Sequence, residues 1–167
     1  KDLALATPVG VAVHPDGSIY IADQGAGGYG NQIHRLRLDG VVENIVSTTG
    51  HENTKGDGGP AIDAEIDTPR AIAIAPDGGL YIVLDSVTTT GTGPGVRRVA
   101  PDGIITTVVG ARRLECPDSV YCGEGGPALD AELLVPRAIA VAPDGSLVMT
   151  DGTAHKLIIT DKAPDES

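Results

Sequence analysis

Two glycine-rich segments of this chain carry side chains suited to binding a metal ion. They read Gly56-Asp57-Gly58-Gly59-Pro60 and Gly123-Glu124-Gly125-Gly126-Pro127, so each places one carboxylate among accessible backbone carbonyls. Calcium prefers oxygen ligands of both kinds. Neither segment has the alternating acidic pattern of a dedicated calcium loop, and acids in glycine-rich turns often bond to their own backbone. Asp57 and Glu124 are therefore candidates for calcium, with a structural turn as the alternative.

Two arginines occupy equivalent places in a repeated phrase. Arg70 and Arg137 each follow a proline at the entry to a predicted strand. A guanidinium at such a place can bind an anion or a carboxylate ligand. The alternative is a salt bridge to the acidic loop that directly precedes each arginine. We treat both residues as binding candidates.

Two tyrosines and two cysteines lie in predicted loops. Tyr29 falls in a glycine-rich loop, and Tyr121 falls between Cys116 and Cys122. An exposed tyrosine combines an apolar ring with a polar hydroxyl, which suits it to contact a partner. For Tyr121 the alternative is a ring folded over a disulfide. We expect Cys116 and Cys122 to form a local disulfide, which implies an extracytoplasmic location; two free thiols are the alternative.

Other familiar chemistry is missing. Gly25 to Gly30 fits the dinucleotide fingerprint, but it leads into a strand and offers no helix N-terminus for a pyrophosphate. The four histidines have no metal-ligand spacing, and no nucleophile elbow or phosphate loop is present. The net charge of -11 repels nucleic acid and anionic membranes, and no apolar run is long enough to span a bilayer. We expect no catalytic residues, no nucleic-acid partner, no membrane insertion and, calcium apart, no cofactor.

One phrase occurs three times, beginning near Pro8, Pro69 and Pro136. Each copy contains an alternating strand, a Pro-Asp-Gly turn and a second strand, and self-similarity of this kind indicates a repeat architecture. Isoleucine or valine alternates with glycine or alanine, so one face of each strand is large and the other is small. Asp23 and Asp151 end the second strands, where we expect a role inside the blade, such as capping backbone donors of the next loop.

The chain resembles the NHL-repeat family of β-propellers, in particular the variety found in teneurin-like and YD-repeat surface proteins of bacteria. The matching stretches are residues 15–23, residues 96–110 and residues 56–61. The resemblance implies an all-β propeller that usually serves as a binding scaffold, and it implies no particular ligand. In the second copy the strand that ends at Asp85 is one residue longer than the family pattern, so we expect a β-bulge there.

We expect a single propeller domain over residues 1–167 with about three four-stranded blades. A closed propeller typically has four to eight blades, so the chain is either half of a six-bladed ring completed by a homodimer or a fragment of a larger propeller. The chain opens in mid-pattern without a methionine, which favours a piece of a longer protein. The expected boundaries are residues 8–47, 69–109 and 136–162 for the blades, 48–68 and 110–135 for two loop insertions, and 3–6 for a strand that closes the third blade.

The long loops should all lie on one side of the blades, where they carry ten acidic and three basic residues. Long loops on a rigid scaffold are common binding sites. We therefore predict a non-enzymatic binding or scaffold module of a secreted or cell-surface bacterial protein, located extracellularly, in the periplasm or at the cell surface. It would recognise a protein or a glycan through the long-loop side. The alternatives are a metal-dependent lactonase or lyase-type propeller enzyme with its site at the central channel, and a purely architectural spacer.

Overall fold

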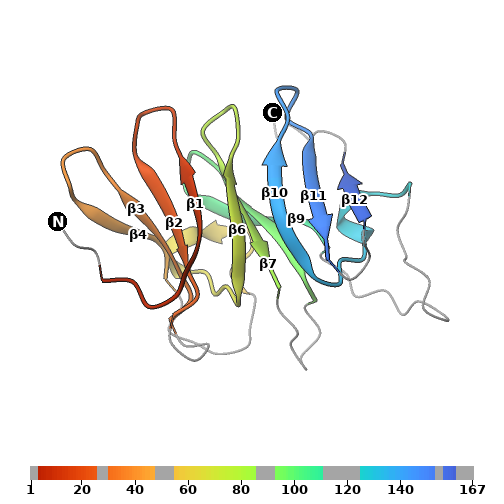
Figure 1. Ribbon diagram of the computed structural model, residues 1–167, viewed down its shortest axis with the longest axis horizontal. Helices are drawn as coiled ribbons and strands as arrows, with labels where there is room; N and C mark the ends of the chain where they lie inside the picture. The colour runs from red at the N-terminus through yellow and green to blue at the C-terminus, as the bar shows by residue number, and fades with distance from the viewer. Residues whose placement is uncertain are drawn as a thin grey trace.

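The computed structural model describes residues 4–25, 30–47, 55–85, 93–110, 125–152 and 156–160. Its strands form three antiparallel sheets that lie side by side, and we name them blades one, two and three in chain order (Figure 1). Blade one contains β1 (Pro8–Val13), β2 (Ile19–Asp23), β3 (Gln32–Leu36) and β4 (Val42–Ser47). Blade two contains β6 (Pro69–Ile74), β7 (Leu80–Leu84), β8 (Gly95–Val99) and β9 (Ile104–Val109), with the short β5 (Gly59–Pro60) paired to β9. Blade three contains β10 (Pro136–Val141), β11 (Leu147–Asp151) and β12 (Lys156–Ile159).

The tight turn between the first two strands of each blade follows from its Asp-Gly sequence. In blade one the Asp16 carboxylate accepts a hydrogen bond from the Ser18 N–H at 2.8 Å, and Gly17 has a φ of 85°. Only glycine adopts such a left-handed conformation without strain. The equivalent bonds in the other blades are donated by Gly79 to Asp77 and by Ser146 to Asp144. The turn chemistry therefore fixes the register of the first two strands.

The first strand of every blade contains the same irregularity in its register. The shift falls between Pro8 and Gly10, between Pro69 and Ala71, and between Pro136 and Ala138. The sequence predicts a bulge in the second strand of blade two, and this location is wrong. Strand β7 ends at Leu84, so the additional residue, Asp85, falls just beyond it. The bulged residues are instead Val9, Arg70 and Arg137, and a bulge redirects its side chain relative to the rest of the strand.

The blades stack through unlike faces. Directly paired residues share a face, so the registers define in each blade a small face, with Gly or Ala on the first strand, and a large face, with Val or Ile there. The small face of blade one, which includes Ala12 and Tyr20, packs against the large face of blade two, which includes Ile72 and Ile82. The small face of blade two packs in the same way against the large face of blade three.

The first strands lie next to one another along the row of blades. Strand β6 contacts both β1 and β10 (Figure 1). The approach is close, because a Cβ atom added at Gly10 would lie 3.4 Å from the Cα of Ala71. Two short 3-10 turns, η1 (Ala61–Asp63) and η3 (Ala128–Asp130), lie near the outer strands and contact β4 and β9 respectively. Small residues on the first strands thus permit the convergence expected near a propeller axis.

The expected closing strand at residues 3–6 is not formed by residues 4–6, the part of it that the structure describes. The backbone N–H groups of Ala6 and Thr7 instead donate to the carboxylate of Asp23 in blade one. Chain length explains the difference. Two residues reach about 7 Å, whereas the outermost strand of a blade lies three strand spacings, about 14 Å, from the innermost. Among the described strands, β12 is the outermost one of blade three.

Candidate functional site

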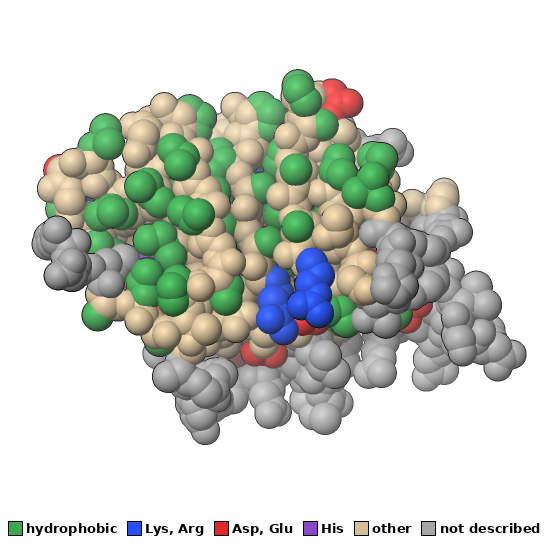
Figure 2. All heavy atoms as spheres, in the orientation of Figure 1, with side chains coloured by type: hydrophobic (Ala, Val, Ile, Leu, Met, Phe, Trp, Pro, Cys, Tyr) green, Lys and Arg blue, Asp and Glu red, His purple; other side chains and the backbone are tan. Residues whose placement is uncertain are grey.

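Arg70 and Arg137 lie at matching bulge positions on the neighbouring strands β6 and β10. Figure 2 shows two basic side chains next to one another over the ends of these strands. Both strands begin where a long loop ends, so the arginines lie on the long-loop side. Blade one has Val9 at the third bulge position. The bulges therefore bring together two residues that are far apart in the sequence.

Arg70 is held by a nearly buried carboxylate. Its Nε and Nη2 atoms donate to Oδ2 of Asp85 at 2.9 Å and 2.8 Å, and the Asp85 side chain is 8% exposed. The alternative interpretation of the sequence predicts a salt bridge to the acidic loop before Arg70. The partner is instead Asp85, which follows β7. The pair fixes the orientation of Arg70 and neutralises part of its charge.

Arg137 has no such partner. It is exposed, and its guanidinium makes no hydrogen bond or ion pair with any of the described residues. The backbone at Gly152 passes close to the Arg137 side chain, since a Cβ atom added at Gly152 would lie 3.0 Å from its Nε atom. The acid that ends β11, Asp151, accepts instead from the backbone N–H groups of Leu134 and Val135. Arg137 is thus an exposed cation whose donors are not used by any of the described residues.

The aspartates that end the second strands cap backbone donors, mostly in the segment before their own blade and not only in the next loop, where the sequence predicts them. Asp23 accepts hydrogen bonds from the N–H groups of Ala6, Thr7 and Gly25. Burial acts to raise the pKa of Asp23, but these three donors and the nearby His34 outweigh it, so the pKa lies below its usual range. The donors of Ala6 and Thr7 precede the first strand, so each cap ties the entry of a blade to the end of its second strand.

Asp57 accepts hydrogen bonds from an arginine buried in blade two. The Arg97 side chain is 1% exposed, and its Nε and Nη2 atoms donate to Oδ1 of Asp57 at 3.0 Å and 2.5 Å. Its Nη1 atom donates to the carbonyl of Glu65 at 2.9 Å. This contact favours the structural alternative to a calcium loop, while calcium binding itself stays a prediction. Among the described residues no group of three or more His, Cys, Asp or Glu side chains could hold a metal ion.

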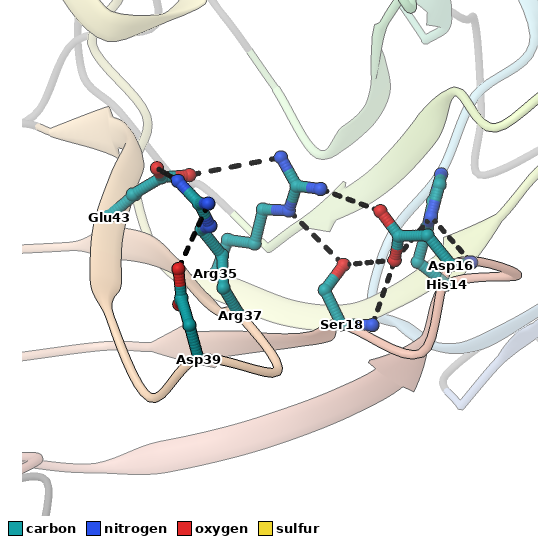
Figure 3. Close-up of polar contacts among 7 residues, drawn as sticks. All are labelled: His14, Asp16, Ser18, Arg35, Arg37, Asp39 and Glu43. Carbon is teal, nitrogen blue, oxygen red and sulfur yellow. Dashed lines mark hydrogen bonds and ion pairs between the residues drawn. The ribbon is translucent and has the colours of Figure 1, made fainter.

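The opposite, short-turn side of blade one carries a polar network that sequence reasoning did not identify (Figure 3). Arg35 donates to Asp16 at 2.7 Å and lies over the ring of Tyr20. The hydroxyl and N–H of Ser18, with His14, hold the pKa of Asp16 below its usual range. Blade two repeats the arrangement with Arg98, Asp77 and Tyr81. The signal is a Tyr-Arg pair directly opposed on neighbouring strands.

The arginines on the short-turn side therefore differ from Arg137 in having acidic partners. Arg37, also on blade one, pairs with both Asp39 and Glu43, and these acids raise its pKa. A groove of about 510 Å³ lies between blades one and two beside the network, lined among others by His14, Tyr20 and Arg35. Each arginine of the network has an acidic partner. Arg137 is the contrasting case on the long-loop side.

Several predicted sites fall outside the described residues. They are Tyr29, Tyr121, Glu124 and the cysteines Cys116 and Cys122, so their predicted roles stay predictions. Within the described ranges no helix is long and apolar enough to cross a membrane.

Comparison with known proteins identifies similar sequences and folds. The family model of the teneurin NHL domain matches residues 39–116. Teneurin-m of Drosophila melanogaster is 26% identical over 163 residues, which cover 94% of this chain and 5% of that protein. Teneurin-1 of Mus musculus is 33% identical over 97 residues, which cover 58% of this chain and 3% of that protein. The chain therefore spans only a small part of these relatives.

Two solved structures share the fold. One is the X-ray structure of a protein assigned as a gluconolactonase, with a TM-score of 0.58 and 16% identity, covering 95% of this chain and 46% of that chain. The other is the calcium structure of a Trichoderma reesei carbohydrate-active enzyme of family AA12, with a TM-score of 0.50 and 18% identity, covering 90% of this chain and 50% of that chain. Similarity at this identity shows the fold alone, which is an all-β propeller as predicted from the sequence. The chain spans about half the length of either structure.

Proposed function

This protein is an NHL-repeat, teneurin-like β-propeller, and we propose that it is a non-enzymatic binding or scaffold module of a secreted or cell-surface protein. It recognises a protein or a glycan through the long-loop side of its blades. The contact is made to carboxylate groups of the partner, which bind Arg137 with help from Arg70.

The observation that carries this proposal is the exposed guanidinium of Arg137. The chain has a net charge of -11, so acidic side chains are plentiful. The short-turn arginines Arg35 and Arg37 have acidic partners, and Arg137 has none among the described residues. A guanidinium presents parallel N–H donors that match the two oxygens of a carboxylate. An exposed arginine with no acidic partner among the described residues is therefore suited to an acid supplied by a partner.

Arg70 strengthens the same site. Its Nε and Nη2 atoms are used by Asp85, which leaves Nη1 without a bond among the described residues, and its side chain is 37% exposed. Because β6 and β10 are neighbours, the two guanidinium groups can engage acidic groups that are close together on one ligand. Acidic peptide segments and glycans that contain uronic acids both present carboxylates in this way. These are the two ligand classes to compare.

Titration with two defined probes tests the proposal. A fluorescent oligoglutamate peptide represents the protein class and a fluorescent oligogalacturonate represents the glycan class, with binding followed by anisotropy. We expect one of them to bind, and Arg137→Ala to weaken it about 10-fold, since a charge-assisted hydrogen bond contributes about 1.5 kcal/mol or more. Arg37→Ala is the matched control, because it removes an exposed arginine that already has acidic partners.

The outcomes separate the classes. Binding of oligoglutamate alone assigns a protein partner, and binding of oligogalacturonate alone assigns a glycan. If neither probe binds, or if Arg37→Ala weakens binding as much as Arg137→Ala, the carboxylate site is wrong. Unchanged thermal unfolding of both variants shows that the comparison reports on binding and not on stability.

A further inference from the structure

The groove between blades one and two, which we call the short-turn groove, has the size of a small-molecule site. Its volume is about 510 Å³, within the range of pockets that bind small ligands. The buried part of its lining is apolar and includes Leu80 and Val99. Three tight turns, which contain Pro15, Pro76 and Pro101, also line it. Strands β1 to β4 and β6 to β9 of its two blades are all described, so the groove is formed by complete blades.

The hydroxyl of Tyr20 has no hydrogen-bond partner among the described residues, although the tyrosine is only 9% exposed. Its oxygen is not among the fully enclosed polar atoms, and the residue lines the short-turn groove. The hydroxyl therefore opens into the groove. Burial raises the pKa of Tyr20, so the hydroxyl stays protonated and can both donate and accept. Because nearly buried polar groups are normally hydrogen-bonded, this hydroxyl points to a ligand in the groove.

His14 presents a second available polar atom beside Tyr20. Its Nδ1 atom lies 2.8 Å from Oδ1 of Asp16, which holds the ring against its own turn. Its Nε2 atom bonds to none of the described residues and faces the turn of blade two, where a Cβ atom added at Gly78 would lie 3.0 Å away. The ring centroids of His14 and Tyr20 are 5.9 Å apart. The two rings therefore lie together in the wall of the short-turn groove.

The charged groups that line the short-turn groove are balanced and held in place. Arg35 is its cation and donates to Asp16 at 2.7 Å (Figure 3). Asp77 is its acid and accepts from the Gly79 N–H at 2.9 Å and from Arg98. One cation and one carboxylate cancel, so the lining favours neither an anion nor a cation. It presents donors and acceptors together above an apolar surface, which suits a neutral ligand with several hydroxyl groups.

The repeats separate the structural part of this wall from the part available to a ligand. Tyr81 has the register position of Tyr20 in blade two, and an arginine lies over the ring in both blades. The tyrosine and arginine therefore belong to the blade framework. The position of His14 differs, because the N–H that bonds back across the turn belongs to Ala75 in blade two and to Ala142 in blade three. The turn does not need a histidine, so the imidazole is free to serve the groove.

We propose that the short-turn groove binds a neutral saccharide, whose hydroxyl groups bond to the Tyr20 hydroxyl and to Nε2 of His14. Sugar hydroxyls both donate and accept, as these two groups together can. The C–H face of a sugar ring packs against the apolar lining at Leu80 and Val99. Arg35 and Asp77, already fixed by their own ion pairs, need no reordering when the ligand binds, which lowers the cost of binding. This site is separate from the arginines on the long-loop side.

Titration calorimetry with defined sugars tests the proposal. Maltotetraose, cellotetraose and mannotetraose are the neutral probes, and tetragalacturonate shows whether the groove takes an anion. We expect at least one neutral probe to bind. Tyr20→Phe removes only the hydroxyl and should weaken that binding about 3- to 10-fold, the effect of one hydrogen bond. His14→Ala should weaken it by a similar factor, and the alanines at this position in blades two and three show that the turn accepts the change.

Tyr81→Phe is the matched control, because Tyr81 has the same register position in blade two and does not line the groove. Arg137→Ala should also leave the neutral probe unaffected, so the carboxylate site can fail without this one failing. Circular dichroism and thermal melts check that each variant keeps its fold. The proposal is overturned if no neutral probe binds, if Tyr20→Phe and His14→Ala leave binding unchanged, if Tyr20→Phe weakens only tetragalacturonate, or if Tyr81→Phe has as large an effect as Tyr20→Phe.

Discussion

Removing the carboxylate of Asp57 should destabilise the fold through the buried Arg97. In the Asp57→Ala variant the guanidinium loses the partner of its Nε and Nη2 atoms and keeps only the carbonyl of Glu65. The arginine side chain is 1% exposed, so water has little access to the donors that are left. Leaving a buried cation without its partner is among the few changes that lower the free energy of unfolding by several kcal/mol.

The magnitude follows from the burial of the two partners. Breaking a fully buried ion pair costs about 3–5 kcal/mol. Asp57 is 50% exposed, so the pair is partly screened and water can partly replace its carboxylate. We therefore expect a loss of about 2–3 kcal/mol in the free energy of unfolding. For a chain of this length that loss corresponds to a melting temperature lower by roughly 5–10 °C.

The assay is urea unfolding followed by circular dichroism, supported by thermal melts, with all variants at the same protein concentration. Asp63→Ala is the matched control, because Asp63 is an exposed acid of the same loop in η1. The double variant Arg97→Met with Asp57→Ala should recover most of the stability, since blade three has the apolar Ile158 at the register position of Arg97. If Asp57→Ala costs no more than Asp63→Ala, the role assigned to Arg97 is refuted.

Two further stability predictions follow from the caps and the turns. Asp23→Asn should cost about 1–2 kcal/mol at pH 7, because a neutral amide replaces the carboxylate that accepts three N–H bonds. The pKa of Asp23 is lowered on folding, so its contribution is complete above the unfolded pKa of about 3.9 and is lost as the pH falls through the folded pKa. Urea titrations at several pH values should show this acid loss in the wild-type chain and a smaller one in the variant. Gly58→Ala should cost about 1 kcal/mol for its left-handed φ alone. Gly56→Ala should cost at least about 1 kcal/mol more in the same urea assay, since its Cβ would lie 2.9 Å from the Cα of Ala64. Equal losses for the two glycines would contradict the close approach at Gly56.

The blade pattern could be predicted from the sequence because it is local and repeated. The alternation of Ile72 and Ile74 with Ala71 and Ala73 already separates the two faces that the structure packs against neighbouring blades. The Asp-Gly turns are likewise local, since Asp16 bonds to a residue two positions away. The caps at Asp23 were also predictable, because the residue recurs at one position relative to the second strand.

The charged contacts could not be predicted in the same way because they depend on register and on distant pairing. Asp57 and Arg97 are separated by 40 residues in the sequence. They meet because β9 pairs both with β8, which carries Arg97, and with β5, which follows Asp57. The partner of Arg70 is Asp85, which a single additional residue places just beyond β7. Neither contact has a fixed sequence spacing. Arg70 therefore has an acidic partner, whereas Arg137 has none in the part of the chain that the structure describes.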